Sequence, residues 1–306
     1  MRIAVTGATG LVGEFLIPRL LEDDHVVHAL WRSEKRWAET FEPNKRLRWF
    51  QGDLMDMRSL ETLVVDCDAV VHAALEHQPG RYRGGEGDDP TRFKLVNLKQ
   101  TEALLKMLQS TQVTRTVFIS SRAVFDGRGK SNASLPDSTP TKPVSLYGEI
   151  KARTEALGDA LSNIGFCTLR PTGIYGATRR PQDNKWSELI SHVSDGDGLS
   201  REYSNQLRTE VHGDDVASAI LLLLTAPVAT VEHRHFNCSD IAVSQAQLVD
   251  LMRQIKDGHT VDLESLPTGT PPTNPMLCDG LLGLGWKPGG MAKLVAALRQ
   301  MLVAPI

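Results

Sequence analysis

The segment TGATGLVG, residues 6–13, follows the short β-branched run Arg2–Thr6 and leads into a stretch whose apolar residues recur at helical spacing. Its three glycines, Gly7, Gly10 and Gly13, lie where a turn from strand to helix would receive the pyrophosphate of a dinucleotide. Glycine is needed there because a side chain would block the tight bend or the approaching phosphate. An ordinary glycine turn is the alternative, but the flanking strand and helix favour dinucleotide binding.

The alternation of strand and helix continues through the first half of the chain. Short apolar runs predict strands at Val26–Leu30, Leu47–Phe50, Ala69–His72, Thr116–Ser120 and Phe166–Arg170. Helical spacing predicts helices at Gly10–Leu21, Ser59–Val65, Leu98–Gln109 and Tyr147–Asn163. Such alternation implies right-handed crossovers and a parallel sheet. We therefore expect an α/β protein built on a Rossmann-type, doubly wound parallel sheet.

After Arg170 the alternation becomes less regular, because residues 175–209 are rich in glycine, aspartate, asparagine and arginine. Later segments predict helices at Trp186–Val193 and Asp214–Thr225, a strand at His235–Asn237 and a last helix after Gly290. We expect a dinucleotide-binding domain at residues 1–174, to which residues 211–240 return. Residues 175–210 and 241–306 are expected to form a smaller C-terminal lobe that binds the substrate.

Composition and charge favour small-molecule chemistry. The 306 residues carry a formal charge of −3 with interspersed signs, which gives no field suited to nucleic acid or an acidic membrane. The longest apolar run, Ala219–Leu224, is too short to cross a bilayer, and the first residues lack the pattern of a secretory signal. The four cysteines are not spaced for a metal site or a redox pair. We expect a cytoplasmic protein with no metal, nucleic-acid or membrane partner.

Tyr147 and Lys151 give the most specific chemical signal, in the segment SLYGEIKARTEAL at residues 145–157. Four residues apart at the start of a helix, their side chains share one face, so the ammonium group can lower the pKa of the phenol. A tyrosine tuned in this way can exchange a proton with a substrate oxygen while hydride moves to or from a nicotinamide. The pair therefore predicts an acid/base catalyst in an oxidoreductase.

Ser120 and Ser121 lie at the end of a predicted strand, in FISSRAVFDG at residues 118–127. Ligands bind at this carboxyl edge of an open parallel sheet. Ser121 is therefore placed to hydrogen-bond the same substrate oxygen that Tyr147 serves. The alternative for a serine at a strand end is a turn-forming role.

The residues after the second and third strands bear on the choice of cofactor. A carboxylate at the end of the second strand usually binds the ribose hydroxyl of NAD, but this chain has Arg32 and Ser33 there. A guanidinium group can pair with the 2′-phosphate of NADP, so NADP is favoured and NAD is the alternative. An arginine that only faces solvent would carry no such meaning. After the third strand, Asp53 can accept a hydrogen bond from the adenine amino group.

In their order and number, these motifs resemble those of the extended short-chain dehydrogenases/reductases, which include nucleotide-sugar epimerases and dehydratases and ketone reductases. The resemblance covers nearly the whole chain and includes VVHAA at residues 70–74, LVNLKQTEALL at 95–105, LRPTGIYG at 169–176 and VHGDDVA at 211–217. It implies that Ser121, Tyr147 and Lys151 are catalytic and that Lys151 also holds the nicotinamide ribose. The predicted cofactor contacts are Gly7, Thr9, Gly10, Leu11, Val12, Gly13, Arg32, Ser33, Asp53, Leu54, Ala73, Ala74, Asn97, Ser120, Tyr147, Lys151, Pro171, Thr172 and Gly173.

Three features bear on the substrate. Resemblance to the nucleotide-sugar enzymes implies an asparagine near the sugar diphosphate, and the presence of Gly173 at that position weakens a nucleotide-sugar substrate. Arg208, four residues before His212, instead matches a phosphate-binding arginine of those enzymes. The insertion at residues 76–93 adds guanidinium groups suited to a carboxylate or phosphate, unless it is only a solvated loop. The predicted substrate contacts are Leu75, Arg81, Arg83, Ser121, Arg122, Tyr147 and Arg208.

The sequence thus predicts NAD(P)-dependent transfer of hydride between nicotinamide and a hydroxyl or carbonyl of a small polar or sugar-like substrate. Two alternatives remain open. A nucleotide-sugar epimerase or dehydratase would use the same step transiently and return its cofactor unchanged, whereas a dinucleotide-sensing protein would bind without turnover. The resemblance also implies a homodimer through the helices Leu98–Gln109 and Glu149–Asn163, whose outer faces would then expose apolar residues.

Overall fold

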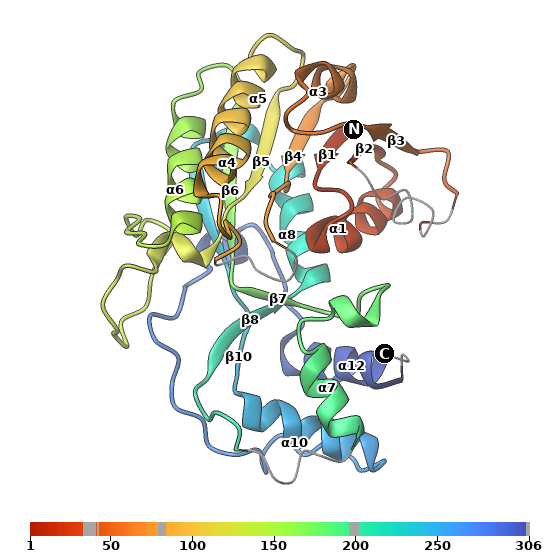
Figure 1. Ribbon diagram of the computed structural model, residues 1–306, viewed down its shortest axis with the longest axis vertical. Helices are drawn as coiled ribbons and strands as arrows, with labels where there is room; N and C mark the ends of the chain where they lie inside the picture. The colour runs from red at the N-terminus through yellow and green to blue at the C-terminus, as the bar shows by residue number, and fades with distance from the viewer. Residues whose placement is uncertain (33–40, 42, 79–83, 196–201, 304–306) are drawn as a thin grey trace.

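The computed structural model describes residues 1–32, 41, 43–78, 84–195 and 202–303. Within these residues, a parallel sheet of seven strands has the order β3-β2-β1-β4-β5-β6-β9 (Figure 1). Its strands are β1 (Arg2–Thr6), β2 (Val26–Trp31), β3 (Leu47–Gln51), β4 (Ala69–His72), β5 (Arg115–Ile119), β6 (Gly165–Pro171) and β9 (Arg234–Cys238). This is the predicted Rossmann-type sheet. Its strand order reverses between β1 and β4, and ligands bind at the carboxyl edge beside such a switch point.

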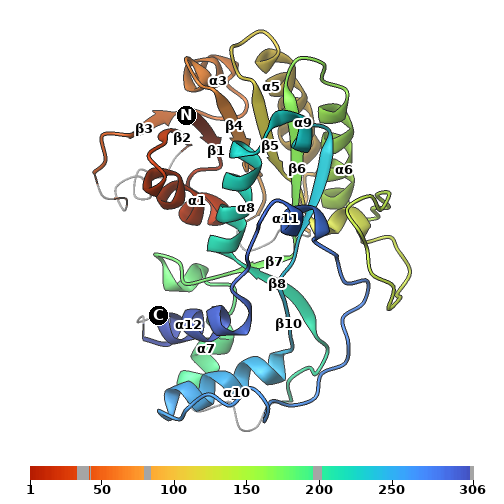
Figure 2. The same ribbon diagram turned by 180° about the vertical axis from the view of Figure 1, so that it is seen from behind.

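Helices cover both faces of the sheet, as Figures 1 and 2 show from opposite sides. One face carries α1 (Leu11–Glu22) and α8 (Gly213–Thr225). The other face carries α3 (Met57–Val64), α5 (Gln100–Leu108) and α6 (Leu146–Asp159). The sheet is therefore the central layer of three.

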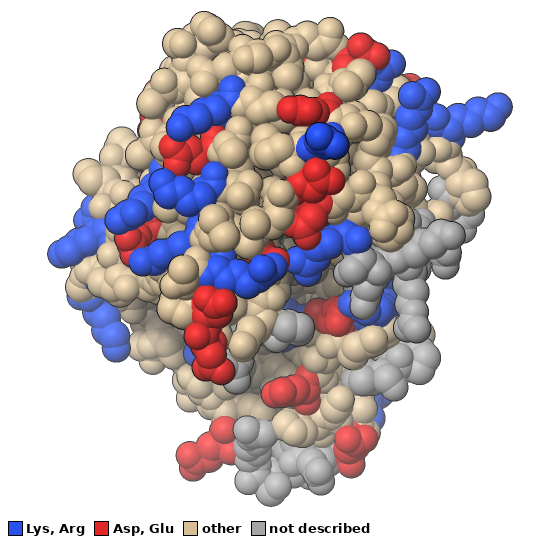
Figure 3. Space-filling model, turned by 45° about the horizontal axis from the view of Figure 1, so that its top comes forward, with Lys and Arg blue, Asp and Glu red and all other residues tan. Residues whose placement is uncertain are grey.

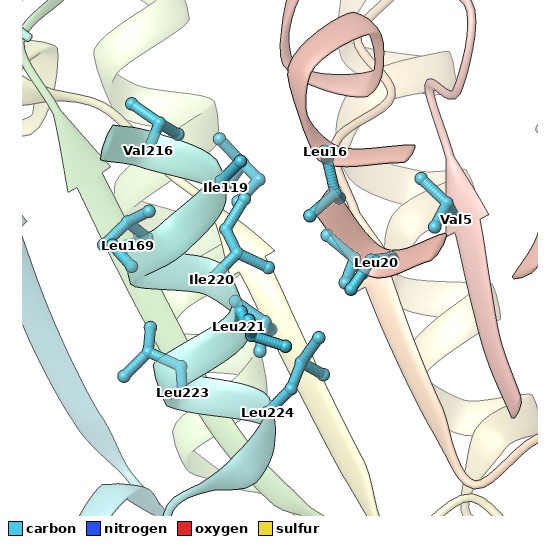
Figure 4. Packing of buried hydrophobic residues seen from close by; sticks show 14 of the residues in the cluster. Val5, Leu16, Leu20, Ile119, Leu169, Val216, Ile220, Leu221, Leu223 and Leu224 are labelled. Carbon is cyan, nitrogen blue, oxygen red and sulfur yellow. The ribbon is translucent and has the colours of Figure 1, made fainter. Parts of the chain in front are cut away.

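The alternation of side chains along the strands explains the two faces. Ile3 of β1 packs into the core beneath α1 and α8, whereas Ala4 packs into the separate core beneath α3 and α5. Figure 4 shows Leu16 and Leu20 of α1 close to Ile220 of α8, and all three are fully buried. Burying a side chain of this size contributes about 1.5–3 kcal/mol. Packing thus holds the N-terminus of α1 beside the carboxyl end of β1.

A smaller lobe lies beside the large sheet, in the lower part of Figure 2. Its three-stranded sheet has the order β10-β8-β7, with β7 at Gly173–Tyr175, β8 at Arg208–His212 and β10 at Ile241–Val243. Its apolar core joins α7 (Ser187–Ser194), α10 (Gln245–Lys256) and α12 (Gly290–Val303). The short remaining elements are α4 (Pro90–Lys94), η1 (Leu95–Lys99), η2 (Arg122–Phe125), η3 (Pro181–Asp183), α9 (Val228–Val231) and α11 (Asp279–Gly283).

The small sheet spans the domain boundary expected from the sequence, since β7 begins at Gly173 and β8 ends at His212. The division into residues 1–174 with 211–240, and 175–210 with 241–306, stays a proposal. In the described parts of the chain, no helix is long and apolar enough to cross a membrane.

Two helix predictions need correction. The helix expected from Leu98 begins earlier, because residues 95–99 form the π-helix η1, which continues directly into α5. The helix expected to reach Asn163 ends at Asp159, where the chain turns and Leu161 packs beside Phe166 in the core between α6 and the sheet. The hydrogen-bond register of a helix and its end depend on such packing, which apolar spacing does not encode.

The outer faces of α5 and α6 carry ion pairs where we expected apolar residues. Lys106 lies 2.8 Å from Glu102 on α5, and Arg153 lies 2.7 Å from Glu149 on α6. Pairs four residues apart stabilise exposed helices, so these faces are compatible with solvent. Positive and negative side chains are likewise interspersed over the face seen in Figure 3.

Candidate active site

The glycine turn lies at the switch point, between β1 and α1. Gly7 has a φ of 73°, and a Cβ built on it would lie 2.6 Å from the backbone of Ala73 and Ala74. A side chain is excluded here both by conformation and by the close approach of the segment after β4. Gly10 caps α1 without a side-chain hydrogen bond, which leaves the first-turn N–H groups open to an anion. The turn also carries the predicted cofactor contacts Thr9, Leu11, Val12 and Gly13.

Arg32, at the end of β2, lies between two carboxylates. Its Nη1 donates to Oε2 of Glu76 at 2.8 Å, and its Nε lies 3.8 Å from Oδ2 of Asp53. Asp53 also accepts a hydrogen bond from the backbone N–H of Met55 through Oδ1. The guanidinium group thus has partners within the protein that the sequence did not predict. Of the other residues predicted here, Leu54 is buried and Ser33 lies outside the described residues.

Asn97 is buried in η1 and fixes the backbone that follows β4. Its Oδ1 accepts from the N–H of Glu76 at 2.7 Å, and its Nδ2 donates to the carbonyl of Glu76 at 2.8 Å. π-Helical turns inside longer helices occur frequently at functional sites. The side chain of Asn97, a predicted cofactor contact, thus holds the loop that follows β4 in place.

His72 ends β4 and is buried in the core. Its ring nitrogens hydrogen-bond the hydroxyls of Thr6 and Thr101 at 2.7 and 2.9 Å. Complete burial, assisted by the charge of Lys151, lowers the pKa of His72 to about 3. The imidazole is therefore neutral, and both of its nitrogens are engaged by threonine hydroxyls of the core.

Tyr147 and Lys151 lie at the start of α6, which Ser145 caps by accepting a hydrogen bond from the N–H of Gly148. Tyr147 is buried in an apolar cluster that also includes Leu75, a predicted substrate contact. Nζ of Lys151 lies 5.8 Å from the centre of the Tyr147 ring. The predicted helical face therefore brings the phenol and the ammonium group together.

The surroundings of Lys151 lower the pKa of its ammonium group. Nζ donates to the carbonyl of Ile119 at 2.7 Å and lies 4.6 Å from the centre of the Phe118 ring. Burial lowers the pKa of Lys151 to about 7, and the negative charge of Glu155 opposes this shift. As pH rises through this value, Lys151 loses the positive charge that favours ionisation of Tyr147.

The two neighbouring serines have different roles. Oγ of Ser121 accepts from the N–H of Ala123 at 3.1 Å and so caps η2, while its own O–H can still donate. Ser120 is buried, and its hydroxyl donates to Oε1 of Glu155 at 2.5 Å. The two hydroxyls therefore differ, because Ser120 already donates its proton to Glu155 whereas Ser121 acts here as an acceptor.

Glu155 is a residue that the sequence analysis missed. It pairs with Arg170 through two hydrogen bonds, Nε to Oε1 at 2.9 Å and Nη2 to Oε2 at 2.6 Å. Both side chains are buried, at 4% and 2% exposed. Glu155 follows Lys151 by four residues, just as Lys151 follows Tyr147, so the repeated spacing on one helical face was the available signal.

On the side of the smaller lobe, Gly173 pairs with Glu210 in the register of β7 and β8. The buried carboxylate of Glu210 forms an ion pair with Lys185, and a Cβ built on Gly173 would collide with both groups. The pKa of Glu210 is raised, because burial outweighs the opposing effect of the positive charge of Lys185. Arg208 is exposed two residues before Glu210, on the same face of β8.

The other predicted site residues lie at the end of β6, in η2 or outside the described part of the chain. Pro171 and Thr172 are buried at the end of β6. Arg122 donates to the backbone carbonyls of Thr273 and Asn274, at 2.6 and 3.0 Å, and so holds a C-terminal segment across η2. Arg81 and Arg83 lie outside the described residues. The four cysteines are buried thiols, and in the described ranges no three His, Cys, Asp or Glu side chains gather as metal ligands.

Comparison with known families identifies the group to which this fold belongs. Residues 3–239 match the NAD dependent epimerase/dehydratase family. The chain belongs to this family. It is therefore an enzyme of the extended short-chain dehydrogenase/reductase type, and NAD(P)-dependent hydride transfer is its chemistry.

Curated relatives of this family member include reductases and dehydrogenases. Cinnamoyl-CoA reductase 1 of Petunia hybrida is 23% identical over 266 residues, which cover 82% of this chain and 76% of the relative. The 3β-hydroxysteroid dehydrogenase/Δ5→4-isomerase of Mycobacterium tuberculosis is 30% identical over 233 residues, 72% of this chain and 61% of that protein. In both comparisons the aligned region covers most of this chain.

Solved structures of similar fold come from nucleotide-sugar enzymes. UDP-glucuronic acid 4-epimerase of Bacillus cereus, solved with UDP-glucuronic acid and NAD, has a TM-score of 0.78 at 22% identity, over 99% of this chain and 98% of its own. A dTDP-glucose 4,6-dehydratase of Streptomyces venezuelae has a TM-score of 0.77 at 21% identity, over 98% and 96% of the two chains. At this level of identity the likeness concerns the fold.

Proposed function

We propose that this family member catalyses net hydride transfer between NADP(H) and a hydroxyl or carbonyl group of a small polar substrate. Tyr147, Lys151 and Ser121 support the chemistry, because all three lie at the carboxyl edge of the sheet. The contacts of Gly7 and the open N-terminus of α1 support dinucleotide binding, because they form a cradle that a Cβ would fill. The choice of NADP rests on Arg32, and the choice of substrate rests on the residues around Gly173.

Nicotinamide, when bound, supplies or accepts the hydride. In the reductive direction, Tyr147 donates the phenolic proton to the substrate oxygen, and in the oxidative direction it removes that proton. Ser121 donates its O–H to the same oxygen and so fixes its position. Lys151, when protonated, favours the phenolate of Tyr147 and thereby assists both directions.

The surroundings of Gly173 carry the preference for net oxidoreduction over nucleotide-sugar epimerisation. An asparagine at this position, as in the nucleotide-sugar enzymes, would have to displace the ends of the Lys185 and Glu210 side chains, which meet beside the glycine. Lys185 is already neutralised by Glu210, so this pair offers no net positive charge to a sugar diphosphate. The alternative of an epimerase or dehydratase draws on the similar folds and on Arg208, whose guanidinium group suits a phosphate.

Net turnover of the cofactor tests this proposal. The enzyme is mixed with NADP or NADPH and a panel of sugars, sugar acids, ketones and nucleotide sugars, and absorbance is followed at the band of reduced nicotinamide. We expect a stoichiometric change in this band with a small polar alcohol or ketone. Conversion of a nucleotide sugar without net change in absorbance would contradict the proposal and favour the epimerase or dehydratase.

Arg32→Ala is expected to weaken NADP binding by about ten- to a hundredfold, because a charge-assisted contact to the 2′-phosphate is lost. NAD has a neutral hydroxyl at this position, so its affinity should barely change. Calorimetric titration of wild type and variant with both cofactors measures the difference. Equal or tighter binding of NAD by the wild type would count against NADP as the natural cofactor.

We also propose that the enzyme is a cytoplasmic homodimer. Because the outer faces of α5 and α6 carry ion pairs, contact between copies through these helices would be polar and sensitive to salt. Light scattering at increasing ionic strength tests the assembly. A monomer at low salt and working concentration would argue against it.

A further inference from the structure

The ion pair between Arg32 and Glu76 links the segments that follow two strands of the large sheet. Arg32 follows β2 and Glu76 follows β4, and these strands are the two neighbours of β1. The glycine turn leaves the carboxyl end of β1, so the paired side chains meet above the place where the adenosine half of a dinucleotide would enter. A group bound at that place must share or replace this contact.

The carboxylate of Glu76 is the fixed member of the pair. Asn97 holds both the N–H and the carbonyl of the Glu76 backbone, and the Glu76 side chain is only 18% exposed. The side chain of Arg32 is 58% exposed and ends a long flexible chain. Of the two side chains in this pair, Arg32 is therefore the one that can turn toward a bound anion.

Glu76 also has a second cationic partner. Arg92 of the insertion donates from Nε to Oε1 at 2.8 Å and from Nη2 to Oε2 at 3.1 Å. This paired geometry positions Arg92 to keep the carboxylate neutralised after Arg32 has left. With Asp53 beside Arg32, the group contains two positive and two negative charges.

We propose that Glu76 determines cofactor selectivity by competing with the 2′-phosphate of NADP for Arg32, and that Arg92 limits this competition by holding Glu76. The proposal rests on dinucleotide binding at the glycine turn, as set out above. Because NAD carries a hydroxyl in place of the phosphate, the competition penalises NADP alone. The insertion thereby influences cofactor choice from outside the strand end that usually decides it.

Three variants test this competition by calorimetric titration with NADP and NAD, which requires no turnover. Glu76→Gln removes the competing charge and should tighten NADP about three- to tenfold. Arg92→Ala leaves Glu76 to Arg32 alone and should weaken NADP by a similar factor. The double variant should bind NADP as Glu76→Gln does, because Arg92 acts only through Glu76. NAD affinity should stay within about twofold in all three.

Asp88→Asn is the matched control, since it removes one negative charge from an exposed position in the same insertion. It should leave the ratio of NADP to NAD affinity unchanged. An unchanged ratio in Glu76→Gln, or a weakening by Arg92→Ala that persists in the double variant, would overturn the proposal. A loss of NAD affinity in Glu76→Gln would also overturn it, by assigning Glu76 to the ribose hydroxyls. Failure of the wild type to bind either cofactor would instead refute the proposed function.

Discussion

Replacing Tyr147 with phenylalanine is expected to reduce turnover by about a hundred- to ten-thousandfold, because the transferable proton is lost while the ring is kept. The phenyl ring can still fill the apolar cluster around Leu75, so the fold should persist. Initial rates under saturating cofactor and substrate measure the loss as a change in kcat. Thermal unfolding and cofactor titration, both close to wild type, would assign the loss to the chemical step.

The control for this experiment removes the same atom elsewhere. Tyr203→Phe deletes a hydroxyl from a tyrosine that packs in the smaller lobe, and turnover should remain near that of the wild type. Lys151→Met provides a second comparison, since it should reduce turnover and also weaken cofactor binding. Activity of Tyr147→Phe within a few-fold of wild type would refute the catalytic assignment.

The large sheet was predictable because its signals are local. Five predicted strands after the first agree with β2, β3, β4, β5 and β6 to within one residue at each end, since short apolar runs bounded by turns correspond to buried parallel strands. The glycine turn was equally visible. The small sheet was not, because β7 and β10 have three residues each and are defined by partners far along the chain.

In the candidate site, too, contacts between residues close in sequence were predictable and contacts between distant residues were not. Tyr147 and Lys151 lie on one helix, so their spacing alone predicted that they would meet. The partner of Arg32 is 44 residues away, and that of Lys185 is 25 residues away. Sequence periodicity cannot predict either pair, because each joins residues that only the folded chain brings together. The sequence analysis therefore named Arg32 as a predicted cofactor contact but missed Glu76, the carboxylate with which it pairs.

Loss of Glu155 is expected to destabilise the fold by about 3–5 kcal/mol, the cost of leaving a buried charge without its partner. In Glu155→Ala, the Arg170 side chain, which is 2% exposed, would keep its hydrogen bond to the Asp137 carbonyl but lose the carboxylate. Ser120 would lose the acceptor of its hydroxyl as well. Equilibrium unfolding in urea, with the slope compared between variants, measures the change in free energy.

Glu149→Ala is the matched control, since Glu149 lies on the same helix and pairs with Arg153 at an exposed position. An exposed pair of this spacing contributes about 0.3–0.5 kcal/mol, so the two glutamates should differ by several kcal/mol. Glu155→Ala should further lower the pKa of Lys151, because the negative charge of Glu155 opposes the effect of burial. A loss of stability no larger than that of Glu149→Ala would mean that Arg170 reaches water or another acceptor, and that Glu155 does not anchor the helix carrying Tyr147 and Lys151.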